Sequence, residues 1–371
     1  MITVLPQNLD CEYRSPAFRS PPPSAQAVRE CSAREIFQAA CQNRATLWQG
    51  DYHNAKQVLA ALKKRLRKPP KPAATPAEAF HKHRLAQSQA ARGADMLLVR
   101  IDPGFELRLP RAPDVAAALA AVYGEANREP FLLPLNQLLG FIGAWQWQLN
   151  GVDTGVLPAR IHVPYGVFSP LRGEYLQLIA QAPLPANAQT AWDIGTGSGV
   201  LALLLHQRGL RNISATDTNP RAIAAARANF ARAGADADIR LLEQDLFPQG
   251  HADLIVCNPP WLPAKPTSEL ETALYDPGHA MLRALLAGAR ERLTPQGQLW
   301  LVMSDLAEHL GLREPQALAQ WFQAAGLRLA NHLQTAPQHP KAADDTDPLA
   351  FARRRERTSL YILEAENGHA A

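Results

Sequence analysis

Strand-like and helix-like patterns alternate along the second half of the chain. Short apolar runs typical of buried strands occur at 190–194, 213–216, 239–242, 252–257, 297–303, 327–333 and 359–363. Helical periodicity separates most of them, at 200–208, 220–233, 278–293 and 315–325. This alternation predicts a parallel sheet covered on both faces. The last two runs are joined by the long connection 334–358 without a helix, so we expect them to pair as an antiparallel edge.

The first half of the chain shows a mainly helical pattern. Apolar residues recur at helical spacing within 33–68, 77–92, 114–123 and 131–149. Residues 1–30 include RSPAFRSPPPSAQA, whose proline density predicts a disordered tail. The segment 63–77 begins with KKRLRKPPKP and predicts an exposed basic linker. We therefore expect a helical N-terminal region over 31–150 that could serve substrate recognition.

A change of pattern near residue 150 predicts the domain boundary. The segment 151–184 opens with short alternating runs and turn residues, GVDTGVLPARIHVPYGVF, which are typical of a hairpin. The α/β domain then follows over 185–366.

Composition limits the class of protein. With 371 residues, 47% of them hydrophobic, the chain has material for two domains. No run approaches 18 consecutive apolar residues and the N-terminus lacks a signal-peptide pattern, so we expect no membrane association. The four cysteines have no metal-ligand spacing. We expect reduced thiols in a cytoplasmic protein, and no metal.

Charge is divided unevenly along the chain. Residues 1–160 carry 20 Lys and Arg against 13 Asp and Glu, a balance of +7, whereas residues 161–371 carry 18 against 21, a balance of −3. A basic first half predicts an anionic partner. A solvated, lysine-rich helix end followed by a proline linker explains the same charges equally well.

A glycine-rich loop follows the first strand of the α/β half. Gly195, Gly197 and Gly199 lie between a strand and a helix, where the backbone can approach a nucleotide-like ligand closely. NAD-binding folds share this signal. Asp217 ends the next strand, where a carboxylate can accept both hydroxyls of a ribose. It could instead belong to the cap of the following helix.

Asp245 comes soon after the third strand, in LEQDLF. The loops at the carboxyl end of a parallel sheet border the ligand crevice, so this carboxylate could accept from an adenine amino group. A solvated loop aspartate is the alternative interpretation.

The stretch Asn258-Pro259-Pro260-Trp261 follows the fourth strand, 65 residues after Asp193. Two prolines stiffen the turn, which can aim the Asn258 side-chain oxygen and a backbone carbonyl at one amino group. These acceptors would bind its two hydrogens and leave its lone pair facing a methyl donor, while Trp261 stacks on the flat group that carries the amine. Catalysis is then mostly positioning and electrostatics. A proline loop beside a core tryptophan is the alternative.

Together these motifs resemble the class I S-adenosylmethionine-dependent methyltransferases of the small-domain group, which includes HemK-type protein glutamine methyltransferases and ribosomal RNA guanine methyltransferases. The resemblance covers about 185–365 and implies a seven-stranded, Rossmann-like α/β sheet with an antiparallel last strand. It implies that S-adenosylmethionine is the cofactor, with the glycine loop at its methionine end, Asp217 at the ribose and Asp245 near adenine. The predicted cofactor-binding residues are Asp193, Gly195, Thr196, Gly197, Gly199, Asp217, Asp245, Asn258 and Phe168; the predicted catalytic residues are Asn258, Pro259, Pro260 and Trp261.

The segment 165–175, YGVFSPLRGEY, resembles the strand and helix that precede the domain in this family and roof the cofactor, so we expect a hairpin and a helix over 151–184. Phe168, Arg172 and Glu174 are therefore further candidates, although the last two could equally form a surface ion pair. The chain also departs from its relatives. Trp261-Leu262 stands where the guanine enzymes carry Phe-His and the HemK type carries Tyr, and residues 169–174 match the HemK segment Pro-Arg-Pro-x-Thr-Glu only in part.

Three functions fit these features. The first is N-methylation of an RNA or DNA base, favoured by the Asn-Pro-Pro-Trp loop, the basic first half and Arg353–Arg355, and it needs a single-stranded or flipped base. The second is methylation of a protein glutamine, whose amide nitrogen is also planar. The third is a non-catalytic cofactor-fold binding protein, against which the intact Asn258 and glycine loop argue. A small-molecule acceptor stays open, and nucleic acid ranks first.

Overall fold

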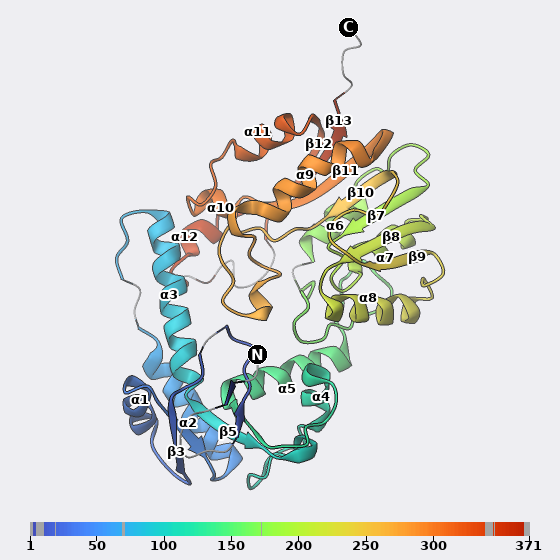
Figure 1. The fold of residues 1–371 in the computed structure, drawn as a ribbon. Helices are drawn as coiled ribbons and strands as arrows, with labels where there is room; N and C mark the ends of the chain where they lie inside the picture. Colours follow the sequence, from blue (N-terminus) through green and yellow to red (C-terminus); the bar gives the residue numbers. More distant parts are fainter. Residues whose placement is uncertain are drawn as a thin grey trace. The chain divides into compact units, whose positions relative to one another are not determined.

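The computed structural model describes residues 3–4, 11–18, 20–68, 71–171, 173–337, 344 and 346–366. These residues divide into two compact units (Figure 1). Unit 1 lies within 1–74, 78–149 and 267–269, and unit 2 lies within 75–77, 150–266 and 270–371.

Unit 2 is built on a seven-stranded sheet in the order β12-β13-β11-β10-β7-β8-β9. The strands are β7 (Thr190–Ile194), β8 (Asn212–Asp217), β9 (Ile239–Glu243), β10 (Ala252–Cys257), β11 (Leu293–Ser304), β12 (Leu327–Thr335) and β13 (Thr358–Ala365). β13 runs antiparallel to both β11 and β12, and the other neighbours pair in parallel. The predicted seven-stranded sheet with an antiparallel pair of last strands at one edge is confirmed.

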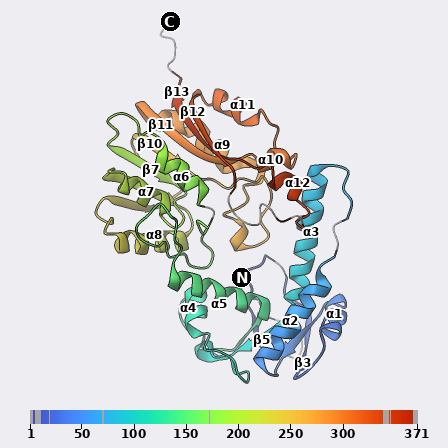
Figure 2. The same ribbon diagram turned by 180° about the vertical axis from the view of Figure 1, so that it is seen from behind.

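Helices cover both faces of this sheet. One face packs against α6 (Glu174–Gln181), α7 (Val200–Gln207) and α8 (Pro220–Ala233), and the other against α9 (Ala280–Arg292) and α11 (Ala317–Ala324). Figure 2 shows α6 from behind the view of Figure 1. Neighbouring strand residues divide between the faces, because successive side chains point to opposite sides: Ala191 joins the first core and Trp192 the second. Short helices α10 (Leu306–His309), α12 (Ala350–Arg353), η2 (Glu269–Glu271) and η3 (Pro277–His279) lie in the connections.

Local sequence signals fix the ends of α8. The Asn219 side chain accepts a hydrogen bond from the Arg221 N–H at 3.0 Å, and Pro220 occupies the first turn. Gly234 ends the helix with a φ of 64°. A polar cap, a proline at the start and a glycine at the end explain why the sequence predicts this helix with its observed bounds.

Unit 1 contains a second sheet, in the order β1-β2-β6-β5-β4-β3. Its strands are β1 (Thr3–Val4), β2 (Glu12–Tyr13), β3 (Ser24–Val28), β4 (Arg44–Trp48), β5 (Leu97–Ile101) and β6 (Phe131–Pro134). The associated helices are α1 (Ala33–Cys41), α2 (Tyr52–Leu66), α3 (Pro76–Ala94), α4 (Ala116–Tyr123), α5 (Leu135–Asn150) and η1 (Pro103–Phe105). β3, β4 and β5 run parallel to one another, and β6 runs antiparallel to β5.

The prediction of a mainly helical N-terminal region is confirmed in part: helices α1 to α5 lie within 31–150, but the prediction missed this sheet. β4, β5 and β6 are four or five residues long and almost wholly buried. A short apolar run has no periodicity that distinguishes a buried strand from part of a buried helix. The single helix predicted over 33–68 is therefore α1 and α2 with β4 between them.

The predicted disordered tail over 1–30 is contradicted where those residues are described. All five residues of β3 pair with β4, and β2 pairs with β6. The β3 residues are exposed or half-buried, so main-chain pairing rather than an apolar face holds this strand. Composition alone therefore gives no sign of it.

Two smaller predictions also change. Residues 63–66 of the predicted basic linker are the last turn of α2, and 69–70 lie outside the described residues. The predicted hairpin within 151–184 is reduced to one antiparallel bridge, in which Val152 and Ile161 exchange backbone hydrogen bonds of 2.8 and 2.9 Å. Pro158 and Pro164 lack the N–H groups that a longer ladder would need.

Candidate active site

The glycine loop forms the first wall of the site. It connects β7 to α7, and Gly195, Gly197 and Gly199 all have positive φ values, of 70°, 56° and 84°. Gly199 is required by space as well as by conformation, because a Cβ there would lie 2.5 Å from a ring carbon of Phe230. The backbone of Gly195 and Gly197 can therefore border the cavity directly.

Asp193 holds the glycine loop in place through hydrogen bonds within it and to the start of α7. Its side chain is fully buried, and Oδ2 accepts from the Thr196 hydroxyl at 2.6 Å and the Ala202 N–H at 3.0 Å. Burial raises the pKa of Asp193 to about 7. Neither Asp193 nor Gly199 lines the cavity, so their positions fit a role in shaping the loop rather than the predicted contact with a cofactor.

Asp217 lies beside the glycine loop, at the end of β8. Oδ2 accepts from the Gly197 N–H at 2.9 Å, and Oδ1 accepts from the Asn219 N–H at 2.8 Å. Burial raises the pKa of Asp217, against the effect of these N–H donors. Each oxygen keeps acceptor capacity toward the cavity, which a pair of ribose hydroxyls could use. Asn219 is the N-cap residue of α8, and Asp217 supports this cap through the Asn219 N–H while it also lines the cavity, so both interpretations of Asp217 hold.

Further residues from the predicted set complete this side. Phe168, Thr196 and the exposed Asp245 line the cavity. Glu174 lies buried at the start of α6 and does not line it, and Arg172 is outside the described residues. The cavity also includes Ile194, Leu201 and Met281, which no sequence signal singled out.

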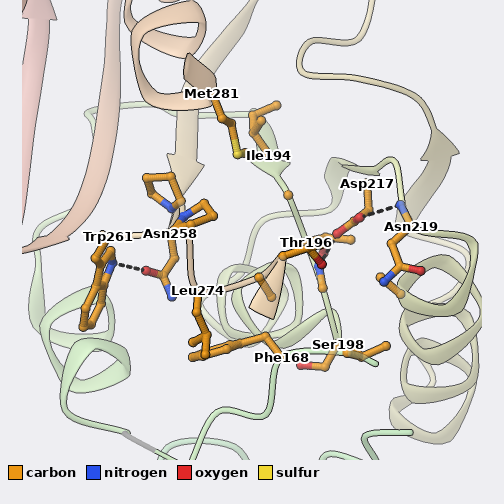
Figure 3. A pocket seen from close by; sticks show the side chains of 18 of the residues that line it. Phe168, Ile194, Thr196, Ser198, Asp217, Asn219, Asn258, Trp261, Leu274 and Met281 are labelled. Atoms are coloured by element: carbon orange, nitrogen blue, oxygen red, sulfur yellow. Dashed lines mark hydrogen bonds between the residues drawn. The ribbon is translucent and has the colours of Figure 1, made fainter. Parts of the chain in front are cut away.

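Asn258 is held from two sides where β10 ends. Its Oδ1 accepts from the indole Nε1–H of Trp261 at 2.9 Å (Figure 3). The buried Tyr175 hydroxyl interacts with the same side chain, and this interaction lowers the pKa of Tyr175 against the larger effect of burial. Burial, with Asp193 and Glu174 nearby, raises the pKa of Tyr175, so its hydroxyl stays neutral. Sequence reasoning missed Tyr175 and expected Trp261 only as a stacking surface.

One cavity of about 600 Å³ has two ends, and different strands of the sheet contribute the residues of each end. β7, β8 and β9 carry the glycine loop, Asp217 and Asp245. β10 carries Asn258, and on its other side it borders β11, which in turn pairs with β13. Figure 3 shows Asp217 and Asn258 on opposite sides, with Thr196 between them. The residues that line the cavity from the β10 side onward are Trp261, Leu262, Thr272, Ala273, Leu274, Tyr275, Leu306, Arg353 and Glu356. We call the two parts the carboxylate end and the Asn258 end.

This fold and this cavity define a class I S-adenosylmethionine-dependent methyltransferase. Residues 160–330 match the family model "Methyltransferase small domain". The chain is 32% identical over 261 residues to a release factor glutamine methyltransferase from Cereibacter sphaeroides. This alignment covers 64% of this chain and 84% of that protein. It is 35% identical over 178 residues to a tRNA1(Val) (adenine(37)-N6)-methyltransferase from Serratia proteamaculans, or 43% of this chain and 64% of that one.

Among solved structures, a ribosomal protein L11 methylase from Lactobacillus delbrueckii subsp. bulgaricus is 20% identical, with a TM-score of 0.39, covering 55% of this chain and 85% of that one. From the sequence matches, the chain belongs to the small-domain group of class I S-adenosylmethionine-dependent N-methyltransferases.

The cavity suits S-adenosylmethionine, the cofactor of this family. The acidic Asp217 and Asp245 offer acceptors for hydroxyl and amino groups, the glycine loop offers open backbone, and Ile194 and Met281 add apolar surface. Within the described ranges, no group of three or more His, Cys, Asp or Glu could hold a metal ion, and no helix is long and apolar enough to span a bilayer.

Proposed function

We propose that the protein methylates an exocyclic amino group of a nucleic-acid base, with Asn258, Pro259, Pro260 and Trp261 holding the acceptor. S-adenosylmethionine supplies an electrophilic methyl group when bound. Asn258 Oδ1 keeps one lone pair beside its bond to Trp261. That lone pair and a backbone carbonyl of the proline turn would accept the two amino hydrogens and orient the nitrogen. Once the nitrogen has accepted the methyl group it is cationic and releases one of its own two protons to solvent, so no strong base is required.

Roles at the carboxylate end follow from the same geometry. Asp217 would accept the ribose hydroxyls with the acceptor capacity left by the Gly197 and Asn219 N–H groups. Asp245 would accept from the adenine amino group, and Phe168 would cover the cofactor. Asp193 would act through Thr196 and Ala202 by fixing the loop.

The observation that carries the choice of nucleic acid is a basic cluster at the end of α2. Lys63, Lys64, Arg65, Arg67 and Lys68 are all exposed, and in the described part of the chain none of their side chains has a hydrogen-bond or ion-pair partner. Cations near a helix C-terminus also stabilise the helix by about 0.3–1 kcal/mol each. Stabilisation of one helix end does not require five unpaired cations within six positions, and these side chains could contact consecutive phosphates.

Labelling identifies the acceptor class. Full-length protein and tritiated-methyl cofactor are incubated with total RNA, total DNA or total protein from cells lacking this protein. Nuclease and protease digestions then show which polymer releases the label. Label released by a nuclease supports the proposal, and label released only by protease refutes it.

The basic cluster has a matched test. Replacing Lys63, Lys64 and Arg65 by Gln should weaken RNA binding and flatten its dependence on salt, because each lost phosphate contact removes about 0.7 units of log–log slope on single strands. The control replaces Arg227, Arg232 and Arg240, three exposed arginines of unit 2, by Gln. Equal effects from both sets, or binding independent of salt, would count against a defined nucleic-acid surface.

A protein glutamine acceptor is the second candidate, favoured by the longer match to the glutamine methyltransferase relative. Asn258 would hold a carboxamide in the same way, because its nitrogen is also planar. The labelling experiment separates the two, since only the glutamine activity places a protease-sensitive, nuclease-resistant label.

We propose the cytoplasm as the site of action. All four cysteines lie in described segments and none forms a disulfide, which fits a reducing compartment.

A further inference from the structure

An arginine lines the Asn258 end of the cavity. α12 and the turn into β13 bring Arg353 and Glu356 to the wall that also contains Leu306. β13 lies on the β10 and β11 side of the sheet, away from the strands that carry the glycine loop and Asp217. Arg353 is therefore placed to meet the methyl acceptor rather than the cofactor.

Arg353 is oriented but keeps donors available. Its Nε lies 2.6 Å from Asp347 Oδ2, as an ion pair without hydrogen-bond geometry, and its side chain is 24% exposed. Asp347 is itself fixed, because its Oδ1 accepts from the Leu349 N–H at 2.9 Å. Across the described residues, the two Nη atoms of Arg353 have no hydrogen-bond partner. Two parallel N–H donors on a planar cation match an oxyanion.

The neighbouring charges point to a repeating anion. Arg354, Arg355 and Arg357 are exposed in the residues that follow Arg353, whereas the acid among them, Glu356, is buried and accepts a hydrogen bond from the Ser304 hydroxyl at 2.8 Å. One carboxylate on a small ligand or peptide would need only the first of these. A polynucleotide offers one phosphate per nucleotide, which matches a series of arginines.

We infer that Arg353 binds the phosphate of the nucleotide whose base lies against Asn258. The inference rests on the proposed nucleic-acid function and adds its substrate unit, a nucleotide rather than a free base or nucleoside. The simplest competing explanation is that the Arg353–Asp347 ion pair only stabilises α12 against the segment that precedes it. That explanation predicts no preference for a phosphate.

Competition distinguishes these explanations. Methylation of total RNA is measured with added mixtures of the four nucleosides or the four nucleoside 5′-monophosphates. For the wild type, we expect the monophosphates to inhibit at concentrations about tenfold lower than the nucleosides, as one charge-assisted contact would give. Arg353→Gln should remove that advantage and raise the KM for RNA by about tenfold, with kcat changed less than about threefold. Arg353→Lys, which keeps the charge without the fork, should recover part of it.

The matched control is Arg355→Gln, which removes an equal charge two residues away and outside the cavity. It should retain the preference for monophosphates. Unchanged preference in Arg353→Gln, or equal loss in Arg355→Gln, overturns the inference while RNA methylation stands. No RNA methylation by the wild type overturns the proposed function and the inference with it. Cofactor affinity measured by calorimetry in each variant separates loss of folding from loss of the phosphate contact.

Discussion

The hydrogen bond from Trp261 to Asn258 gives the sharpest test of the site. Trp261→Phe keeps an aromatic ring in the loop and removes the indole N–H that lies 2.9 Å from Asn258 Oδ1. Tyr175 still holds the other side of the amide. The loss is therefore one neutral, partly buried hydrogen bond, about 1 kcal/mol, or roughly fivefold in rate if the bond acts only by positioning.

We expect kcat to fall about three- to tenfold in Trp261→Phe, with cofactor affinity within about twofold, because no residue of the carboxylate end changes. Single-turnover transfer of a tritiated methyl group gives the rate, and calorimetry gives the affinity. Trp147→Phe is the control, since Trp147 is 55% exposed in unit 1. A wild-type rate in Trp261→Phe, or a loss confined to cofactor binding, would refute the positioning role.

The same reasoning applies to the second contact. If Tyr175 and Trp261 hold one amide, Tyr175→Phe and Trp261→Phe should not be independent. The double variant should depart from the sum of the single effects by about 0.5 kcal/mol or more. Strict additivity in a double-mutant cycle would mean that the two side chains act separately.

Three further outcomes follow from the geometry. Asp217→Ala should weaken cofactor binding by about 1–3 kcal/mol, measured by calorimetry, because the ribose hydroxyls lose a buried acceptor; unchanged affinity would exclude Asp217 from the site. Asn258→Ala should bind cofactor normally but turn over about a hundredfold more slowly in the methyl-transfer assay, and a wild-type rate would disprove the clamp. Burial raises the pKa of Asp193 from 3.8 to about 7, so the folded chain holds a proton that the unfolded chain releases. Stability should thus decrease as pH rises between these values, and Asp193→Asn should flatten that part of a denaturation–pH profile; parallel profiles would contradict it.

Hydrophobic periodicity and the helix- and strand-ending residues were sufficient to predict the seven-stranded sheet of unit 2 and its longer helices, but not α12 (Ala350–Arg353) in a connection predicted to have no helix, nor the short bridge in place of the hairpin. The longer helices of unit 2 are bounded by glycine, proline and capping residues, as at Asn219 and Gly234 around α8, and are long enough to show a 3.6-residue repeat. The strands of unit 1 lack those signals. β4 and β6 are short buried runs inside stretches that also form helices, and β3 is an edge strand held by main-chain pairing, so neither side-chain pattern nor composition indicates them.

The sequence predicted the site residues that lie at or directly after the end of a strand, and missed those that lie elsewhere. The glycine loop, Asp217 and the Asn-Pro-Pro-Trp turn each follow a strand directly, so their meeting at one sheet edge follows from topology. Tyr175, Met281 and Arg353 come from helices and connections up to about 180 residues apart along the chain, and only tertiary packing brings them to the cavity.

The Asn258 end therefore decides what kind of N-methyltransferase this chain is. A carboxamide and a base amino group would present the same two hydrogens to Asn258, so the clamp that we propose does not by itself select between them. Selection must come from groups that meet the rest of the substrate. On this chain those groups are cationic, since Arg353 lines the wall and the cluster at the end of α2 is exposed and unpaired within the described residues. Cations favour a polyanion over a neutral peptide loop through both attraction and phosphate geometry. If the substrate is a protein after all, it must bring acidic groups to these arginines, and neutralising Arg353 should impair it as well.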